Sequence, residues 1–318
     1  MMPAGGRLDT VARLALAEFD AGPVLTAEPL PGSTPAVCKV VTSTGAFVLK
    51  PADRIADVEL QAEVAARLNA VGVRQARVLR TSSGSLVTTS GHVLLEYLPG
   101  SVRTGPTPEQ VRATMRHFAS YHLALGQVAA SLRADDSSLW ARVAEPGFLV
   151  AALPELLASH GLACAETAAA IDYLDRTRGA LDALPRQLVH GDIGPDNVLM
   201  SGDEVVSLID FTPHWASVLF AASSAMYWYH VAGRSDVSIA ELKASLSAMA
   251  DVRPWTDNEL ALWPAGLVLE ALRRLATPLE LARVAANQPA PSTAPRLAAL
   301  RAVVRVLPGL SDSLARRP

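Results

Sequence analysis

The sequence predicts an α+β chain of two lobes: a small antiparallel sheet with one helix against it, followed by a larger, mainly α-helical region. Short segments rich in β-branched residues, separated by turn-forming residues, fill the first hundred positions. Beyond residue 106, apolar residues recur at helical spacing over longer segments. A chain of 318 residues also exceeds the usual size of one domain. We therefore expect a first lobe over 1–98 and a second over 99–318.

The elements expected in the first lobe are separated by turns or breakers. Gly72 is expected to end a helix that Asp53 caps, because apolar residues keep helical spacing between them. The turn sequences "PGSTP" and "STG" separate three strands. In chain order, the expected elements are a helix over 8–19, strands over 23–30, 36–42 and 45–51, a helix over 53–73, and strands over 85–91 and 92–98.

The second lobe is expected to be helical except for one hairpin. That hairpin is formed by "NVLM" (197–200) and "VVSLID" (205–210), joined by the turn sequence "SGDE". The expected helices cover 108–132, 147–183, 217–232, 238–250 and 257–287, with a last helix after the loop 287–295. A ligand site is expected between the lobes, where such sites are often found.

Composition excludes several classes of partner. The net charge of −3 gives no broad basic field, which argues against nucleic acid or an anionic membrane as partner. No run of about 18 apolar residues and no leader-like start are visible. Cys38 and Cys164 fit no metal-ligand spacing and are expected to be free thiols in a reducing compartment. We expect a cytoplasmic chain with a small-molecule partner; its oligomeric state is not predicted.

The stretch "LVHGDIGPDNVLM" (188–200) concentrates polar residues between apolar flanks. Gly191, Gly194 and Pro195 prevent a helix, so Asp192 and Asn197 are expected on a loop.

The following hairpin would return Asp210 beside Asn197. Mg²⁺ prefers oxygen ligands and usually takes one or two from the protein, with phosphates and water completing its shell. Asn197 and Asp210 are therefore candidate magnesium ligands. Asp192 is then the candidate base for a hydroxyl that attacks a phosphoryl group.

A cation from the first lobe is expected to meet the phosphates. Lys50 ends the strand "AFVLK", and lysine is a rare choice here, since Lys39, Lys50 and Lys243 are the only lysines among 28 basic residues. A carboxylate on the next helix would hold Lys50 in place; we favour Glu63 over Glu59. The loop 29–35 would cover the phosphates with backbone N–H groups of Gly32, Ser33 and Thr34.

The ordered motifs "VLK", "LLEYLPG", "HGDIGPDN" and "LIDF" resemble the aminoglycoside phosphotransferase and choline kinase-like family, whose fold is similar to that of protein kinases. The resemblance covers residues from about 24 to 230. It implies that Asp192 is the catalytic base, that Asn197 and Asp210 hold magnesium, and that Lys50 contacts the ATP phosphates and pairs with Glu63. It also implies a hinge beside adenine formed by Glu96, Tyr97 and Leu98. Gly194 and Thr212 depart from the usual pattern, where relatives carry histidine and protein kinases carry glycine.

Structural interpretations compete with several of these assignments. Asp192, Asn197 and Asp210 would otherwise belong to capped turns of a plain hairpin, and Lys50 would be an exposed strand-end lysine. His190 is interpreted as a structural residue that bonds backbone and holds the turn. Asp196 is expected to cap the turn, while His122 and the run "MYWYH" (226–230) are expected in the core.

The sequence identifies the acceptor less well. From residue 211 onward eleven basic residues face eight acidic ones, a balance that does not suit a polycationic antibiotic. Four of the five tryptophans lie there too; aromatic faces suit sugars, although core packing is the alternative. The candidate substrate contacts are Asp257, Glu259, Glu270, Arg273 and Arg274.

We therefore predict an ATP- and Mg²⁺-dependent kinase for a small-molecule hydroxyl. Aminoglycoside-like or other antibiotic sugars are the preferred acceptors, which would give a role in antibiotic resistance. A metabolite such as a sugar, homoserine or choline is the alternative acceptor. A protein acceptor is disfavoured because no "APE"-like segment follows Asp210. A non-catalytic nucleotide-binding protein of the same fold is the alternative from another class.

Overall fold

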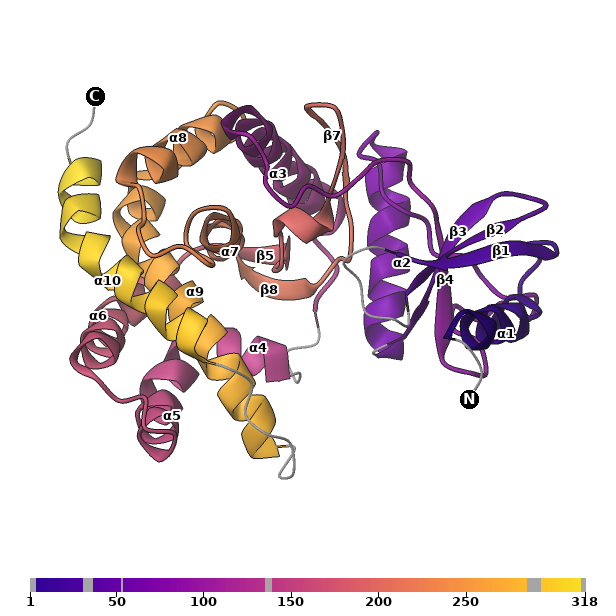
Figure 1. Cartoon of the computed structure of the whole chain (residues 1–318). Helices are drawn as coiled ribbons and strands as arrows, with labels where there is room; N and C mark the ends of the chain where they lie inside the picture. The colour runs from indigo at the N-terminus through magenta and orange to yellow at the C-terminus, as the bar shows by residue number, and fades with distance from the viewer. Residues whose placement is uncertain (1–3, 31–36, 53, 135–138, 285–292, 316–318) are drawn as a thin grey trace.

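The computed structural model describes residues 4–30, 37–52, 54–134, 139–284 and 293–315. Its first lobe is a four-stranded antiparallel sheet in sequence order (Figure 1). The elements of this lobe are α1 (Ala4–Leu16), β1 (Val24–Pro29), β2 (Cys38–Thr42), β3 (Ala46–Pro51), α2 (Ile55–Ala70) and β4 (His92–Glu96). The predicted α+β architecture, with a small sheet lobe before a helical one, is confirmed.

The sheet packs against a helix on each face. Leu94 of β4 is buried in one cluster with Leu16 of α1, whereas its neighbours Val93 and Leu95 are buried in another with Val58 of α2. This alternation follows from the two-residue period of a strand. The sheet therefore contacts two helices where the sequence led us to expect one.

Helix α2 connects the sheet lobe to the rest of the molecule. It lies between the sheet and the larger lobe in Figure 1, and its Val64 and Leu68 belong to the same buried cluster as Phe118 of the larger lobe. The helix ends as expected, with Gly72 just beyond it at φ 83°. The expected cap, Asp53, lies outside the described residues.

The strand expected over 85–91 is wrong. That segment forms turns, and a different stretch meets the free edge of β4: the N–H of Leu79 donates to the carbonyl of Leu94 (2.8 Å). Serine and threonine side chains take the backbone N–H groups instead; Ser85 Oγ accepts from Val87 (3.1 Å) and Thr88 Oγ1 from His92 (2.9 Å). Such local bonds compete with strand pairing.

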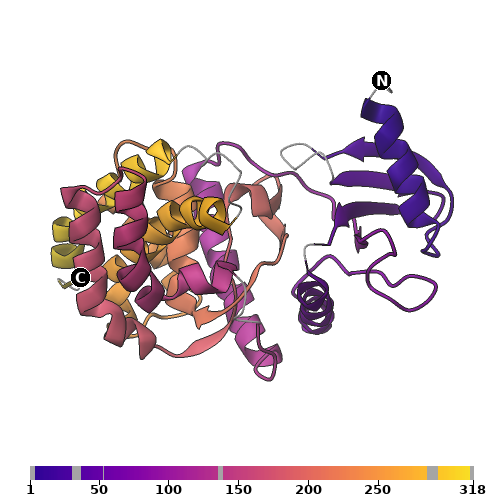
Figure 2. The same ribbon diagram turned by 90° about the horizontal axis from the view of Figure 1, so that it is seen from below.

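The larger lobe is built from helices around two short strand pairs, and the segment after β4 leads into it (Figure 2). Its elements are α3 (Pro108–Val128), α4 (Leu139–Ala144), α5 (Pro146–Ser159), α6 (Ala165–Asp182), β5 (Arg186–His190), the 3₁₀ turn η1 (Pro195–Asn197), β6 (Val198–Ser201), β7 (Glu204–Leu208), β8 (Pro213–Ser217), α7 (Val218–His230), α8 (Ile239–Ala250), α9 (Asp257–Val284) and α10 (Ala294–Ala315).

Two details of this lobe differ from expectation. The helix predicted over 147–183 is interrupted between α5 and α6, where Gly161 has φ 66° and turns the chain. Residues 213–217, directly before the predicted helix over 217–232, form β8, which pairs antiparallel with β5. The predicted hairpin is confirmed as β6 and β7.

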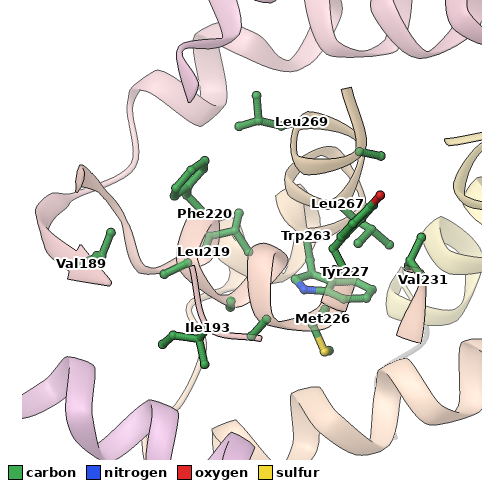
Figure 3. Close-up of a cluster of buried hydrophobic side chains, with 14 of the residues drawn as sticks. Val189, Ile193, Leu219, Phe220, Met226, Tyr227, Val231, Trp263, Leu267 and Leu269 are labelled. Carbon is green, nitrogen blue, oxygen red and sulfur yellow. The ribbon is translucent and has the colours of Figure 1, made fainter. Parts of the chain in front are cut away.

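The core of the larger lobe lies between α7 and α9. Trp263 is fully buried there beside Met226 and Leu267 (Figure 3), so this tryptophan fills the core. Nearly every residue of α7 is buried, which matches its apolar sequence. No helix in the described ranges is long and apolar enough to cross a membrane.

Candidate active site

The loop after β5 is held by close backbone packing. The N–H of Gly191 donates to the carbonyl of Thr212 (2.9 Å), and a Cβ at Gly191 would lie 1.9 Å from the His214 ring. Only glycine at position 191 allows these two backbone segments to approach this closely. Beyond it, Ile193 is fully buried and η1 turns the chain into β6. The loop therefore fixes Asp192 between two buried anchors.

Asp192 is a half-buried carboxylate with two donors on one oxygen. Its Oδ1 accepts from Trp228 Nε1 (3.0 Å) and from Arg274 Nη2 (2.6 Å). Burial acts to raise the pKa of Asp192, but the charge and hydrogen bond of Arg274 and the bond from Trp228 outweigh it and hold the pKa below its usual value. Asp192 is thus ionised at neutral pH, and its Oδ2 has no hydrogen-bond partner among the described residues.

Two buried histidines hold the backbone next to this loop through hydrogen bonds. His190 is fully buried, its Nε2 bonds the carbonyl of Ile209 (3.0 Å), and burial lowers its pKa, so it stays neutral. His122 Nε2 accepts from the backbone N–H of His190 (3.2 Å), which leaves Nδ1 to donate to the carbonyl of Phe118 (2.9 Å). Burial also lowers the pKa of His122, to about 3. Both contacts agree with the structural interpretation of these residues.

Asp210 lies where the hairpin returns to the loop. It has φ 55°, the one positive φ outside glycine among the described residues. Such strained conformations cluster at functional sites. The N–H of Ile209 donates to the carbonyl of Asn197 (2.9 Å), which brings Asp210 and Asn197 to the same place. The expected proximity of the two side chains is therefore supported by backbone pairing.

Asn197 and Asp210 fit a magnesium ion chemically. The amide nitrogen of Asn197 donates to the carbonyl of Asp192 (2.8 Å), which leaves the amide oxygen for another partner. The Asp210 side chain is 60% exposed. Within the described ranges no three His, Cys, Asp or Glu side chains group around a metal position. A site here would use one carboxylate and one amide, with phosphates and water as the other ligands, as Mg²⁺ accepts.

The pairing of Lys50 differs from expectation. Lys50 Nζ bonds Asp210 Oδ1 (2.6 Å), across the two lobes. Glu63 instead accepts from Arg67 one helical turn away (2.7 Å), and Glu59 is exposed. The predicted Lys50–Glu63 pair is therefore absent from this structure. The physical reason lies in the neighbours: Asp210 is the carboxylate that the β6–β7 hairpin places beside Lys50, and Arg67 has the (i, i+4) spacing that suits Glu63.

The other nucleotide-site candidates lie around the junction of the lobes. Glu96 ends β4, where its carboxylate pairs with Arg77 (3.0 Å). The N–H of Tyr97 donates to the carbonyl of Ala46 (3.2 Å), and Leu98 is buried. The backbone N–H of Leu98 has no partner among the described residues, as a hinge that meets adenine requires. Gly32, Ser33 and Thr34 lie outside the described residues.

The five candidate substrate contacts lie in different environments. Glu259 is 4% exposed, and its carboxylate accepts from Arg253 (2.6 Å) and from the backbone of Thr256 (2.9 Å). It stabilises the start of α9 and is not open to a substrate. Asp257, in the first turn of the same helix, is exposed. Glu270 is completely buried as well. Of this set, the structure brings only Arg274 to Asp192.

Glu270 neutralises two buried arginines. Its oxygens accept from Arg273 Nε (2.6 Å) and Nη2 (2.7 Å) and from Arg274 Nε (2.6 Å). The side chain of Arg273 is only 3% exposed. Glu270 and Arg273 are thus structural residues that fix Arg274.

Replacing Glu270 with glutamine is expected to destabilise the fold, because two buried guanidinium groups lose their counter-charge. Breaking a buried pair from one side typically costs about 3–5 kcal/mol. Chemical denaturation measures the free energy of unfolding. Glu109→Gln is the control, since Glu109 pairs with Arg112 at the surface and should change stability by less than about 1 kcal/mol. Equal losses in both variants would contradict this role of Glu270.

Trp228 was missed from the sequence as a site residue. Its indole bonds Asp192 and lies over Gly194, where a Cβ would approach the ring to 3.1 Å. The Arg274 guanidinium lies over the same ring, 4.5 Å from its centroid. The departure at Gly194 was the available signal, because a missing side chain leaves room for a large one.

Trp228→Phe is expected to keep the packing but remove the donor to Asp192. Because that donor favours the charged carboxylate, its loss raises the pKa of Asp192, and the acidic limb of the pH–rate profile moves to higher pH. We also expect turnover to fall about tenfold. Trp255→Phe is the control, since Trp255 bonds the carbonyl of Leu246 instead (3.2 Å). An unmoved acidic limb in Trp228→Phe would contradict this role.

The two lobes and the residues between them define a protein with the kinase-like phosphotransferase fold. Solved structures confirm the fold: an aminoglycoside phosphotransferase from Alicyclobacillus acidocaldarius superposes with a TM-score of 0.65 at 18% identity, covering 99% of this chain and 96% of that one. An amicoumacin kinase in complex with AMP-PNP and Ca²⁺ gives 0.66 at 14% identity, covering 96% and 93%.

The family follows from the sequence match. The model of the phosphotransferase enzyme family (APH) matches residues 26–213, more than half of the chain, so the chain belongs to that family. A homoserine kinase from Methylobacillus glycogenes is 39% identical over 94 residues, 29% of each chain. The match therefore spans about three tenths of the length of this curated relative.

Proposed function

We propose that the protein transfers the γ-phosphoryl group of ATP to a hydroxyl of a small molecule, with Mg²⁺ as the metal. The observation that carries this proposal is the convergence of Lys50, Asp192, Asn197 and Asp210 at the junction of the lobes. Membership of the phosphotransferase enzyme family supports it. The non-catalytic alternative is disfavoured because each of the four side chains needed for transfer is present.

In this proposal each residue has one task. Asn197 and Asp210 hold Mg²⁺, which would neutralise charge on the transferring phosphoryl group. Lys50 binds phosphate oxygens as a point charge. Asp192 accepts a hydrogen bond from the acceptor hydroxyl through its free Oδ2 and takes the proton as the oxygen attacks phosphorus. Catalysis then rests on positioning and electrostatics, with no covalent enzyme intermediate.

The Lys50–Asp210 pair must open for this to happen. Lys50 Nζ lies 2.6 Å from Asp210 Oδ1, yet we assign Lys50 to phosphate and Asp210 to the metal. Nucleotide and metal supply the missing counter-charges to each, so the exchange keeps both groups paired.

For the acceptor, the charge next to Asp192 now favours a metabolite over an aminoglycoside. A guanidinium 2.6 Å from the base repels a polycation. The partial match to homoserine kinases points in the same direction, since homoserine is a small hydroxy compound. An antibiotic sugar without excess positive charge remains the second candidate, because the amicoumacin kinase has the same fold.

An ADP-release assay over a panel of acceptors tests the proposal. We expect ADP formation that requires Mg²⁺ and depends on one acceptor class among sugars, homoserine, choline, aminoglycosides and other antibiotics. Magnesium-dependent binding of ATP with no ADP formation from any acceptor would favour the non-catalytic alternative. No ATP binding at all would overturn both the proposed kinase activity and the non-catalytic alternative.

A further inference from the structure

Arg274 presents unused donors beside the proposed base. Its Nε bonds Glu270, and its Nη2 bonds Asp192 and Ser224. Nη1 has no hydrogen-bond partner among the described residues and is not one of the buried unpaired atoms, so it reaches solvent. The side chain as a whole is 15% exposed. The unpaired donors therefore belong to the same guanidinium whose Nη2 contacts Asp192.

This guanidinium is held rigidly. Glu270 fixes its Nε end from the core (2.6 Å), and the Trp228 ring supports its face at 4.5 Å. A group held in this way loses little conformational entropy when a ligand binds, so its hydrogen bonds contribute more to affinity. Exposed arginines on long, free side chains lack this advantage.

The charged groups around Arg274 balance, so no excess negative charge repels an added anion. Helix α9 contributes Arg273 and Arg274 against the single buried Glu270, so Asp192 is the second charge that balances the pair. Tyr227, beside Arg274, has a pKa raised by burial and then by Glu270, and three arginines oppose that rise: Arg273, Arg274 and Arg296. Arg296 lies in the first turn of the next helix, α10.

We propose that Arg274 Nη1 binds a carboxylate of the acceptor while Asp192 Oδ2 accepts the hydroxyl of the same molecule. The acceptor is then a small hydroxy acid or hydroxy amino acid. Arginine suits this role because its planar donors match carboxylate geometry. Arg274 and Asp192 are 2.6 Å apart, so one small molecule spans both. This inference rests on the proposed function and names its substrate class.

Calorimetry with matched acceptors tests the inference. The protein carries Mg²⁺ and AMP-PNP, and each hydroxy acid is compared with the alcohol that lacks its carboxylate: homoserine with 2-amino-1,4-butanediol, and glycerate with glycerol. For at least one pair we expect the acid to bind about 10- to 100-fold more tightly, the range for a hydrogen-bonded charge. Arg274→Gln should abolish that difference, and Arg274→Lys should keep part of it.

Arg283→Gln is the matched control. It removes the same charge from the same helix, where the exposed side chain of Arg283 pairs with Glu280, and should keep the full preference. Thermal unfolding and AMP-PNP affinity are measured for every variant, so that a folding defect in Arg274→Gln is recognised. In that case the preference of Arg274→Lys for the acid over its alcohol decides whether the inference holds. The inference is overturned if no acid binds better than its alcohol, or if both Arg274 variants keep the full preference.

ADP formation in the same samples with ATP separates the two proposals. Selective acid binding without ADP would leave the carboxylate site standing and overturn the kinase. ADP formation with alcohols, or with an aminoglycoside such as kanamycin, at equal efficiency in wild type and Arg274→Gln would leave the kinase standing and overturn the carboxylate site.

Discussion

Replacing Asp192 with asparagine is expected to lower turnover by about 10²- to 10⁴-fold, the range for a lost general base. The amide keeps the shape of the carboxylate, so the bonds from Trp228 and Arg274 to Oδ1 have an oxygen to reach. It cannot take the proton of the acceptor hydroxyl. ATP affinity should change little, because Asp192 contacts neither phosphate nor adenine in this account. Steady-state kinetics with the preferred acceptor and calorimetry with AMP-PNP measure the two quantities.

A surface aspartate provides the control for Asp192. Asp172 pairs with Arg176 on α6, and its side chain is 65% exposed. Asp172→Asn removes the same charge far from the loop after β5 and should have near-normal turnover. If Asp192→Asn also has near-normal turnover, Asp192 is not the base.

Asp210→Asn is the second change with a large expected effect. It removes the charge of the proposed magnesium ligand and the partner of Lys50, so we expect the affinity for AMP-PNP to fall about 10- to 100-fold in the presence of Mg²⁺. Without Mg²⁺ the loss should be small, because no metal then links Asp210 to the phosphates. Calorimetric titrations with and without Mg²⁺ separate the magnesium-dependent loss of AMP-PNP affinity from any loss that does not depend on the metal.

Asp203→Asn is the control for Asp210. Asp203 lies in the turn of the same hairpin and accepts from Gln110 (3.0 Å), away from the proposed metal position. Its replacement should leave the magnesium dependence intact. Equal magnesium dependence in wild type and Asp210→Asn would mean that the metal ligands are elsewhere.

The parts of the site that the sequence predicted are close together along the chain. Gly191, Gly194 and Pro195 exclude a helix after β5, and the β6–β7 hairpin returns Asp210 to Asn197, so local turn chemistry fixes the geometry. Segments rich in β-branched residues, separated by turn sequences, similarly predicted the strands β1, β2 and β3. These features depend on neighbours in sequence, which pattern reasoning can follow.

The missed parts depend on distant neighbours. Trp228 and Arg274 meet Asp192 from 36 and 82 residues away, and helical spacing alone cannot tell which arginine of α9 points to the base. Lys50 likewise pairs with Asp210, which lies 160 residues later in the chain, and not with Glu63. The wrong strand over 85–91 has a local cause, since serine and threonine side chains there satisfy the backbone.

Transfer of labelled phosphate from ATP to the acceptor tests the central claim most directly. ATP labelled at the γ-phosphate is incubated with Mg²⁺ and the acceptor pool, and the products are separated and examined by phosphorus NMR and mass spectrometry. We expect a phosphate monoester on an acceptor hydroxyl, formed by wild type and lost in Asp192→Asn. Label released only as inorganic phosphate, or the same ester formed equally by Asp192→Asn, would contradict it.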